Sequence, residues 1–191
     1  MDIRNFFFKN RSYTPIPLAL IIIYFSQPTV PYIYIGLVCL LLGESIRFWA
    51  VRYAGGITRT TKVGAPALCS SGPFAHVRNP LYTGNFLIFT GVALVAGAPQ
   101  IWIILAVTWG FLITQYSLIV DLEEETLFEL FGNDYVLYKE NVPKLAPRLS
   151  PWKIKDNRSP MSWKKTLKTE KRTLQNMVLI FVLILIRQLF I

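Results

Sequence analysis

Charge is scarce in this sequence. Only 16% of its 191 residues are Asp, Glu, Lys or Arg, whereas 53% are hydrophobic. Soluble domains usually contain about 25% charged residues, and a soluble domain of this size has too much surface to hide so many apolar side chains. The same composition excludes a disordered chain. It therefore predicts an all-α integral membrane protein.

Residues that bind metals are also scarce. The chain has one histidine, His76, and two cysteines, Cys39 and Cys69, which form no CxxC pair. A zinc or iron–sulfur site needs more nitrogen and sulfur ligands than these, so we expect no metal. No small-residue cleavage site follows the first apolar run, so we expect no cleavable signal peptide.

Five apolar segments are candidates for membrane helices, because about 20 apolar residues cross a bilayer core of about 30 Å. They are residues 13–26, 30–42, 81–98, 100–120 and 174–191, and the second is expected to continue past Glu44 to Trp49. The first is short, so it either crosses at a tilt or forms half of a short hairpin with the second. We divide the chain into an N-terminal helical hairpin (1–52), a core (53–149) and a basic linker with a C-terminal transmembrane helix (150–191).

Positive charge alternates from loop to loop. Residues 52–79 hold four basic and no acidic residues, and residues 139–172 hold eleven basic against three acidic ones, whereas the turns near Pro28 and Pro99 are uncharged. By the positive-inside rule, the N-terminus, the 52–79 loop and the 121–172 segment are expected to be cytoplasmic. This pattern accounts for most of the net charge of +9, so we expect no nucleic-acid partner.

Two polar stretches are predicted to meet at the cytoplasmic end of the third and fourth segments. These segments join through the tight turn at Pro99, so residues whose numbers sum to about 197 should lie at similar depth. Residues 74–79 would then lie beside residues 118–123. We predict a cytoplasmic site between the two stretches.

The first stretch leads into a helix. Asn79 and Pro80 fit an N-cap followed by proline at the first helical position. The open N–H groups of that helix, with Arg78 beside them, favour a carboxylate or phosphate. Gly84 permits close approach of a ligand or of a neighbouring helix. The alternative is that Arg78 only anchors the headgroup region.

The second stretch is acidic, and its glutamates suit an ammonium group or ribose hydroxyls. Beyond it, Leu127 and Phe131 share a helix face, and Gly132 is predicted to end the helix. A short helix should then begin at Asn133 or Asp134. Its tyrosines, at positions 135 and 138, suggest an amphipathic helix on the membrane with aromatic anchors at headgroup depth.

The spacing GPFxxxRNPxYxG, followed after about forty residues by EExxLxxxFGxxYxxY and VPxxxP, resembles the isoprenylcysteine carboxyl methyltransferase family. It is similar, more loosely, to the membrane phospholipid N-methyltransferases. The match runs from about Thr60 to Pro147. The resemblance implies that residues 53–149 form a methyltransferase core. It also implies an S-adenosylmethionine-dependent enzyme with its cofactor at the cytoplasmic mouth of the bundle, and the chain has no GxGxxG motif of a Rossmann domain.

The resemblance also implies residue roles at the matching positions. The adenosine would be lined by Ala67, Leu68, Cys69 and Phe74. The methionine and ribose would be surrounded by Asn79, Pro80, Leu81 and Tyr82. Glu123, with Glu124 as the neighbouring candidate, would bind the cofactor from the facing helix. Arg78, the catalytic candidate, would orient the anionic end of the cofactor or acceptor. Asn79 and Phe74 replace a common His and Tyr, and residues 117–121 lack the Arg that often precedes the paired glutamates.

The function implied is carboxyl O-methylation of an isoprenoid or prenylcysteine-like acceptor that enters from the membrane lipid. The alternatives are phospholipid (amine) N-methylation, an NADPH-dependent reductase of the steroid-reductase type, and a non-catalytic membrane scaffold. The expected location is the plasma or inner membrane of a prokaryote, or the endoplasmic reticulum of a eukaryote. We expect no obligate protein partner. His76 is expected to be an interfacial polar residue, although His76 or Glu124 would be the candidate base for an amine acceptor. Residues 150–191, which match no motif, are expected to cover the bundle or shape a lateral entrance without building the cofactor site.

Overall fold

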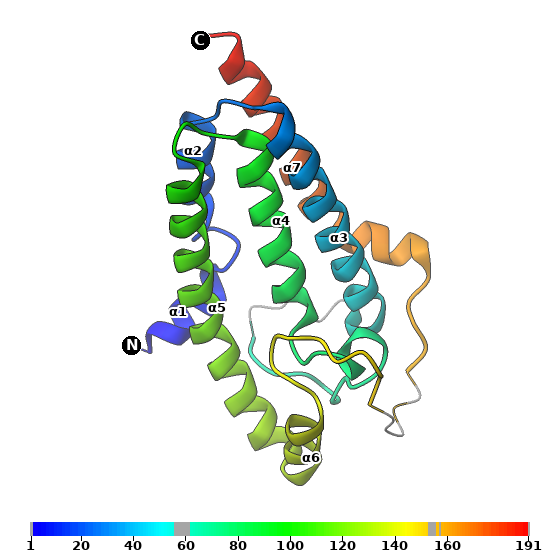
Figure 1. Cartoon of the computed structure of the whole chain (residues 1–191). Helices are drawn as coiled ribbons and strands as arrows, with labels where there is room; N and C mark the ends of the chain where they lie inside the picture. Colours follow the sequence, from blue (N-terminus) through cyan, green and yellow to red (C-terminus); the bar gives the residue numbers. More distant parts are fainter. Residues whose placement is uncertain (1, 56–61, 153–155, 157, 191) are drawn as a thin grey trace.

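The computed structural model describes residues 2–55, 62–152, 156 and 158–190, so Thr60, where the resemblance begins, lies outside the described residues. Every regular element within those ranges is helical. They are α1 (Ile3–Asn10), α2 (Ile16–Tyr24), α3 (Val30–Ala54), the 3-10 turn η2 (Gly72–Ala75), α4 (Pro80–Ala96), α5 (Ile101–Phe131), α6 (Asn133–Asn141) and α7 (Trp163–Gln188). Figure 1 shows α2, α3, α4, α5 and α7 running lengthwise in one elongated bundle, with α6 folded back at one end and the C-terminus at the other.

All five apolar segments form helices, with boundaries that differ from the predicted ones. Two of them, α3 and α5, are long and apolar enough to cross a membrane, and α4 is a shorter apolar helix. The helix α5 continues through the acidic run to Phe131, and α7 begins in the basic linker at Trp163. The membrane character is thus supported by two helices, and five spans remain a prediction. Sequence analysis missed α1, which packs against α5 through the buried Phe8.

Proline and glycine set the helix ends. A proline occupies the first or second position of α2, α3 and α4, where its missing N–H has no helical partner to lose. Gly97 ends α4 with a φ of +60°, a conformation that residues with a Cβ rarely adopt. The amide of Gln27, in the α2–α3 turn, donates to the carbonyl of Ala96 at 2.9 Å. This bond fixes the α2–α3 turn to the end of α4.

The closest helix packing joins α3 to α4 through glycines. A Cβ added to Gly43 would lie 2.7 Å from the carbonyl oxygen of Gly84, and one added to Gly36 would lie 2.7 Å from that of Gly91. The two pairs are seven residues apart on both helices, so they form one contact seam between antiparallel helices. Of the two options that the sequence left open for Gly84, the structure shows the neighbouring helix. The turn at Pro99 also forms as predicted, but the tightest pair is α3–α4.

The helix α7 packs against both α3 and α2. At its start, the amide of Met161 donates to the carbonyl of Arg52 at 2.7 Å. At its other end, Nε2 of Gln188 donates to the carbonyl of Ser26 at 3.1 Å. Between these ends, Arg47 on α3 forms a 2.7 Å ion pair with Glu170, whose side chain is fully buried. The C-terminal helix is therefore built into the bundle.

Gly43→Ala should destabilise the protein, because the new methyl group meets a backbone oxygen that cannot move without separating α3 from α4. We expect a loss of about 1–3 kcal/mol, as for other overpacked sites. The measurement is the thermal unfolding midpoint in detergent. Gly110→Ala is the control, since a Cβ there has no neighbour within 4 Å and alanine favours the helix. Equal midpoints for the two variants would contradict the glycine seam.

Candidate functional site

Arg78 joins three helices at one end of the bundle. It lies just before α4, and its Nε and Nη2 donate to Oε1 of Glu124 on α5 at 3.1 and 2.9 Å. Its Nη1 donates to the carbonyls of Lys139 and Val142, at the end of α6, at 3.0 and 2.6 Å. The two charged side chains are only 8% and 12% exposed. We call these contacts the Arg78 clamp.

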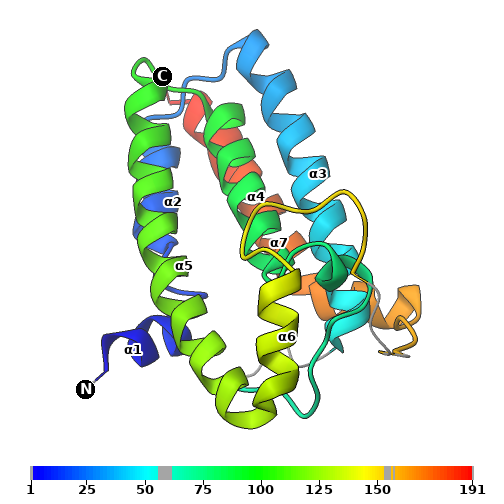
Figure 2. The same ribbon diagram turned by 60° about the horizontal axis from the view of Figure 1, so that its bottom comes forward.

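In the Arg78 clamp, all three guanidinium nitrogens donate hydrogen bonds to other residues of the chain. Cationic side chains are favourable at helix C-termini, where carbonyls lack helical partners, and the guanidinium satisfies two such carbonyls of α6 together with a carboxylate. Figure 2 shows the result, with α6 turned back toward the start of α4. Arg78 therefore has a structural role in this fold, which the sequence did not indicate.

The adjacent glutamates have different surroundings. Glu124 is held by Arg78 and has Lys139 at 3.7 Å. Glu123 accepts one hydrogen bond, at 3.0 Å, from the hydroxyl of Tyr82 on α4. A carboxylate can accept about four hydrogen bonds, so Glu123 keeps capacity for a ligand. The two polar stretches therefore meet as predicted. The predicted register is wrong, because Tyr82 and Glu124 lie outside the ranges 74–79 and 118–123 that were expected to face each other.

Aromatic packing holds the Tyr82–Glu123 pair in place. The ring of Tyr82 lies 4.8 Å from that of Tyr116 on α5, centroid to centroid. Tyr116 in turn packs in a cluster with Phe8 of α1 and with Leu112 and Ile119 of α5. Tyr82, which donates to Glu123, is thus packed in a cluster formed by α1, α4 and α5.

Asn79 occupies the predicted cap position, but its side chain does not cap the helix. Its Nδ2 donates instead to the carbonyl of Lys144 at 3.1 Å, because the segment that leaves α6 passes beside it. The backbone carbonyl of Asn79 accepts from the amides of Tyr82 and Thr83 at 3.1 Å. Pro80 is buried at the start of α4, as predicted, and Leu81 is half-buried in the first turn.

Of the four residues expected at the adenosine, which lie in the loop before α4, Phe74 and Leu68 contact α6. The hydroxyl of Tyr138 donates to the carbonyl of Phe74 at 2.8 Å, and Leu68 packs against the same tyrosine cluster. Burial raises the pKa of the Cys69 thiol to about 11, so this thiol is neutral near pH 7. Ala67 is exposed at the start of this loop.

The helix α6 corrects one expectation. Tyr135 and Tyr138 share a face as predicted, but each is only 2% exposed and both lie in a core cluster with Val142, Leu127 and Trp152. They are therefore not anchors at headgroup depth. Gly132, with a φ of +52°, turns the chain so that this aromatic face packs beneath the loop that precedes α4.

The C-terminal extension also differs from expectation, because it contacts the candidate site. Oδ2 of Asp156 accepts from the amide of Ser70 at 2.9 Å, and Nη2 of Arg158 donates to the carbonyl of Ala67 at 2.7 Å. The amide of Trp152 donates to the carbonyl of Ala75 at 2.9 Å. The extension therefore holds residues 67–75 in place. Sequence reasoning missed Asp156 and Arg158, because no local pattern signals a contact between segments this far apart.

His76 also makes contacts that hold the fold together. Its Nδ1 lies 2.8 Å from the carbonyl oxygen of Arg148, and its ring lies 5.7 Å from that of Trp49. Its own carbonyl accepts from the amide of Arg148 at 2.9 Å. These contacts attach the segment after α6 to the turn before α4.

Comparison with known proteins identifies the family. The family model described as phospholipid methyltransferase matches residues 31–134, which is more than half of the chain. This chain therefore belongs to the phospholipid methyltransferase family. The match covers α3, α4 and α5, which contain the glycine seam and both glutamates.

Curated relatives agree with the resemblance to the isoprenylcysteine carboxyl methyltransferases. The chain is 29% identical to the protein-S-isoprenylcysteine O-methyltransferase of Rattus norvegicus over 124 residues, 62% of this chain and 42% of that protein. It is 30% identical to that of Xenopus laevis over 118 residues, 59% of this chain and 40% of that protein. It is also 27% identical to the cobalt-zinc-cadmium resistance protein CzcN of Cupriavidus metallidurans over 114 residues, 58% and 48% of the two chains. The chain thus spans less than half the length of these relatives, and no solved structure matches it.

Replacing Arg78 by Lys should destabilise the protein although the charge is kept. A lysine has one ammonium group and cannot bind Glu124 and two carbonyls with the planar geometry of a guanidinium. We expect a loss of about 1–3 kcal/mol from the unsatisfied buried acceptors, measured by thermal unfolding in detergent. Glu124→Gln should act on the same contacts, so the double variant should lose less than the sum of the single losses. Additive losses, or an unchanged midpoint in Arg78→Lys, would contradict the clamp. Lys144→Gln, which removes an exposed pair with Asp121, is the control.

Asp156→Ala should loosen the loop that contains Cys69. In a Cys39→Ser background, the pKa of about 11 leaves little of Cys69 as the reactive thiolate at pH 8. We therefore expect Cys69 to react with iodoacetamide about a hundredfold more slowly than an ordinary thiol. Asp156→Ala should raise this rate, and Glu129→Gln, an exposed change on α5, should not. A fast reaction of the Cys39→Ser protein would contradict the burial of Cys69. An unchanged rate in Asp156→Ala would contradict the role of Asp156 in holding the loop.

Proposed function

We propose that this chain is an integral membrane methyltransferase that uses S-adenosylmethionine and methylates the carboxylate of an isoprenoid or prenylcysteine-like acceptor. The observation that carries the proposal is the carboxylate of Glu123, fixed by Tyr82 beside the N-terminus of α4 in a chain of the phospholipid methyltransferase family. The names of the rat and Xenopus relatives support the acceptor class.

The groups of the candidate site suit the cofactor. S-adenosylmethionine carries an ammonium group, a carboxylate, ribose hydroxyls and an apolar adenine. Glu123 can bind the ammonium group or the hydroxyls, and the N-terminal turn of α4, from Pro80 to Tyr82, favours the carboxylate. Phe74 and the loop of Ala67, Leu68 and Cys69 offer apolar surface for the adenine. Asn79 lies where this loop meets α4.

Within this proposal, Arg78 and Glu124 are positioning residues. The Arg78 clamp holds the start of α4 against α5, and so fixes the distance between Tyr82 and Glu123. It also fixes α6, whose Tyr138 holds Phe74. Arg78 and Glu124, which the sequence suggested as ligand contacts, would therefore act by holding the elements of the site, and Glu123 would be the acidic residue that contacts the cofactor.

The chain would act mainly by orientation. When bound, S-adenosylmethionine supplies a methyl group on a positively charged sulfur. An acceptor carboxylate is already ionised near pH 7, so no residue has to remove a proton, and one oxygen–carbon bond forms as the carbon–sulfur bond breaks. Glu123 and the start of α4 would hold the two poles of the cofactor, next to the aromatic packing of Tyr82 on Tyr116. Such positioning accounts for much of the rate of in-line transfer.

The second candidate is N-methylation of a phospholipid amine, which the description of the family model favours. An amine acceptor must first lose a proton. The two residues considered for that step are His76 and Glu124. The first has its Nδ1 beside a backbone carbonyl, and the second is held by Arg78. These contacts favour the carboxylate acceptor, which needs no base.

The proposed location is a membrane, with the site at the end of the bundle that carries the basic loops. Arg52 and Lys62 lie at that end, near the start of α7 and the loop before α4. By the positive-inside rule this end faces the cytoplasm. The supply of S-adenosylmethionine and the proposed site are then on the same side.

Glu123→Gln should weaken cofactor binding by about 1.5–3 kcal/mol, the usual loss of a charge-assisted hydrogen bond. Binding of S-adenosylhomocysteine to the detergent-solubilised protein, measured by calorimetry, gives the difference. Glu125→Gln is the matched control, since Glu125 is 54% exposed and its carboxylate pairs with Arg4. Equal weakening by the two variants would mean that the site senses only the net acidic charge.

The chemical nature of the product separates the two acceptor classes. Incubation with methyl-labelled S-adenosylmethionine and a membrane lipid extract should produce label that mild base releases as methanol, because the expected product is an ester. Label that survives base would indicate N-methylation. No transfer to any lipid fraction, by a protein that binds S-adenosylhomocysteine, would contradict both.

A further inference from the structure

The helix α7 has two faces of opposite character. Its inner face packs on the bundle, with Thr166, Glu170 and Ile184 buried and Glu170 paired with Arg47. Its outer face is exposed. Only the outer face is therefore accessible to a ligand.

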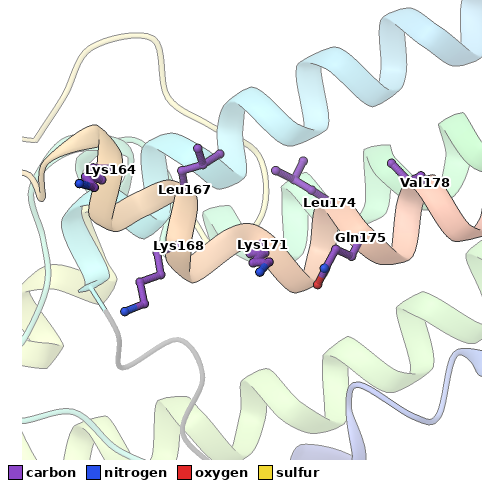
Figure 3. Close-up of a pocket in the computed structure, with 7 residues that line it drawn as sticks. All are labelled: Lys164, Leu167, Lys168, Lys171, Leu174, Gln175 and Val178. Carbon is purple, nitrogen blue, oxygen red and sulfur yellow. The ribbon is translucent and has the colours of Figure 1, made fainter.

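That outer face borders a shallow, widely open groove of about 590 Å³, whose lining residues all belong to α7. Figure 3 shows its lining side chains projecting from α7, with three lysines toward the start of the helix, followed by Leu174, Gln175 and Val178 toward its middle. The lysines are Lys164, Lys168 and Lys171, interleaved with Leu167 and followed by Leu174 and Val178. The groove thus changes from cationic to apolar along one helix.

The cationic half lies at the end of the bundle that carries the basic loops. Residues at the start of α7 bond to Arg52, and the guanidinium of Arg52 lies 3.9 Å from the ring centroid of Trp163. Helical side chains point back toward the N-terminus, so the three ammonium groups reach toward this end. The apolar half extends toward the middle of the bundle, where lipid chains would lie.

The lysines have no acidic partner in the chain as described. Among residues 2–55, 62–152, 156 and 158–190, no carboxylate forms an ion pair with Lys164, Lys168 or Lys171. Glu170, the acidic residue of this helix, points the other way, to Arg47. Three cations in a row next to apolar surface match an amphiphile with an anionic head.

We propose that this groove binds an anionic phospholipid of the surrounding membrane. The phosphate lies against Lys164, Lys168 and Lys171, and an acyl chain lies along Leu174 and Val178. Cationic residues near an anionic leaflet attract such lipids. Along α7 the lysines precede the apolar residues, which matches a lipid whose phosphate lies at the membrane surface and whose acyl chains extend inward. The proposal does not depend on the reaction that the chain catalyses.

The test uses the full chain in a neutral detergent, titrated with dioleoyl phosphatidylglycerol or dioleoyl phosphatidylcholine, with the unfolding midpoint as the readout. Phosphatidylglycerol should stabilise the protein at lower concentration than phosphatidylcholine. Lys164→Gln combined with Lys168→Gln should raise the half-saturating concentration about 25-fold, or about fivefold for each lysine. The matched control, Lys165→Gln with Arg172→Gln, removes the same charge from neighbouring exposed positions of α7 that do not line the groove, and it should leave that concentration within about twofold.

Two further arms keep the test decisive. Lys164→Arg with Lys168→Arg keeps the charge, so it should keep the response to phosphatidylglycerol even if the glutamine variant unfolds. Soluble glycerol 3-phosphate should not reproduce the stabilisation, because it lacks the chain that Leu174 and Val178 contact. Equal responses to the two lipids, equal losses in the groove and control variants, or full stabilisation by glycerol 3-phosphate would each overturn the proposal.

Discussion

The candidate site of this protein depends on the contacts of one buried guanidinium. Arg78 binds the carboxylate of Glu124 and two carbonyls at the end of α6. Removing one partner of such a pair leaves the other charged and buried, which costs far more than the pair contributes. The three helices that meet there are therefore held in one arrangement. Glu123 is the neighbour of Glu124, and Tyr82 lies one helical turn after Arg78, so their relative position is fixed by the same contacts.

A second buried pair does the same for the C-terminal helix. Arg47 and Glu170 are almost fully buried between α3 and α7, and Asn85 on α4 accepts from Nη1 of Arg47 at 2.5 Å. The segment that leads into α7 holds the loop before α4 through Asp156 and Arg158. The extension, which matches no motif, is thus part of the support of the proposed cofactor site. It also presents the lysines of the lipid groove on its outer face.

Much of the fold was predictable, because helix signals are local. The apolar runs, Pro80 at a helix start, the turn at Pro99 and Gly132 at a helix end predicted features that the structure contains. The hairpin at Pro99 predicted that the two polar stretches meet. The family resemblance, confirmed by the relatives, came from fixed spacings over less than half of the chain. The predictions for single residues were wrong where the residue contacts a partner far away in the sequence. Tyr138 was taken for a membrane anchor because its partner, Phe74, lies in a distant loop.

The sequence by itself determined the class of the protein. Its apolar composition and charge pattern indicate a helical membrane protein, and its motifs indicate a methyltransferase family. Only the tertiary structure separated Glu123 from Glu124, because neighbouring positions on a helix point about 100° apart and meet different helices. It likewise decided that Arg78 holds the walls of the site and that residues 156 and 158 belong to them. Periodicity shows which residues share a face, but the partner of that face depends on how the whole chain packs.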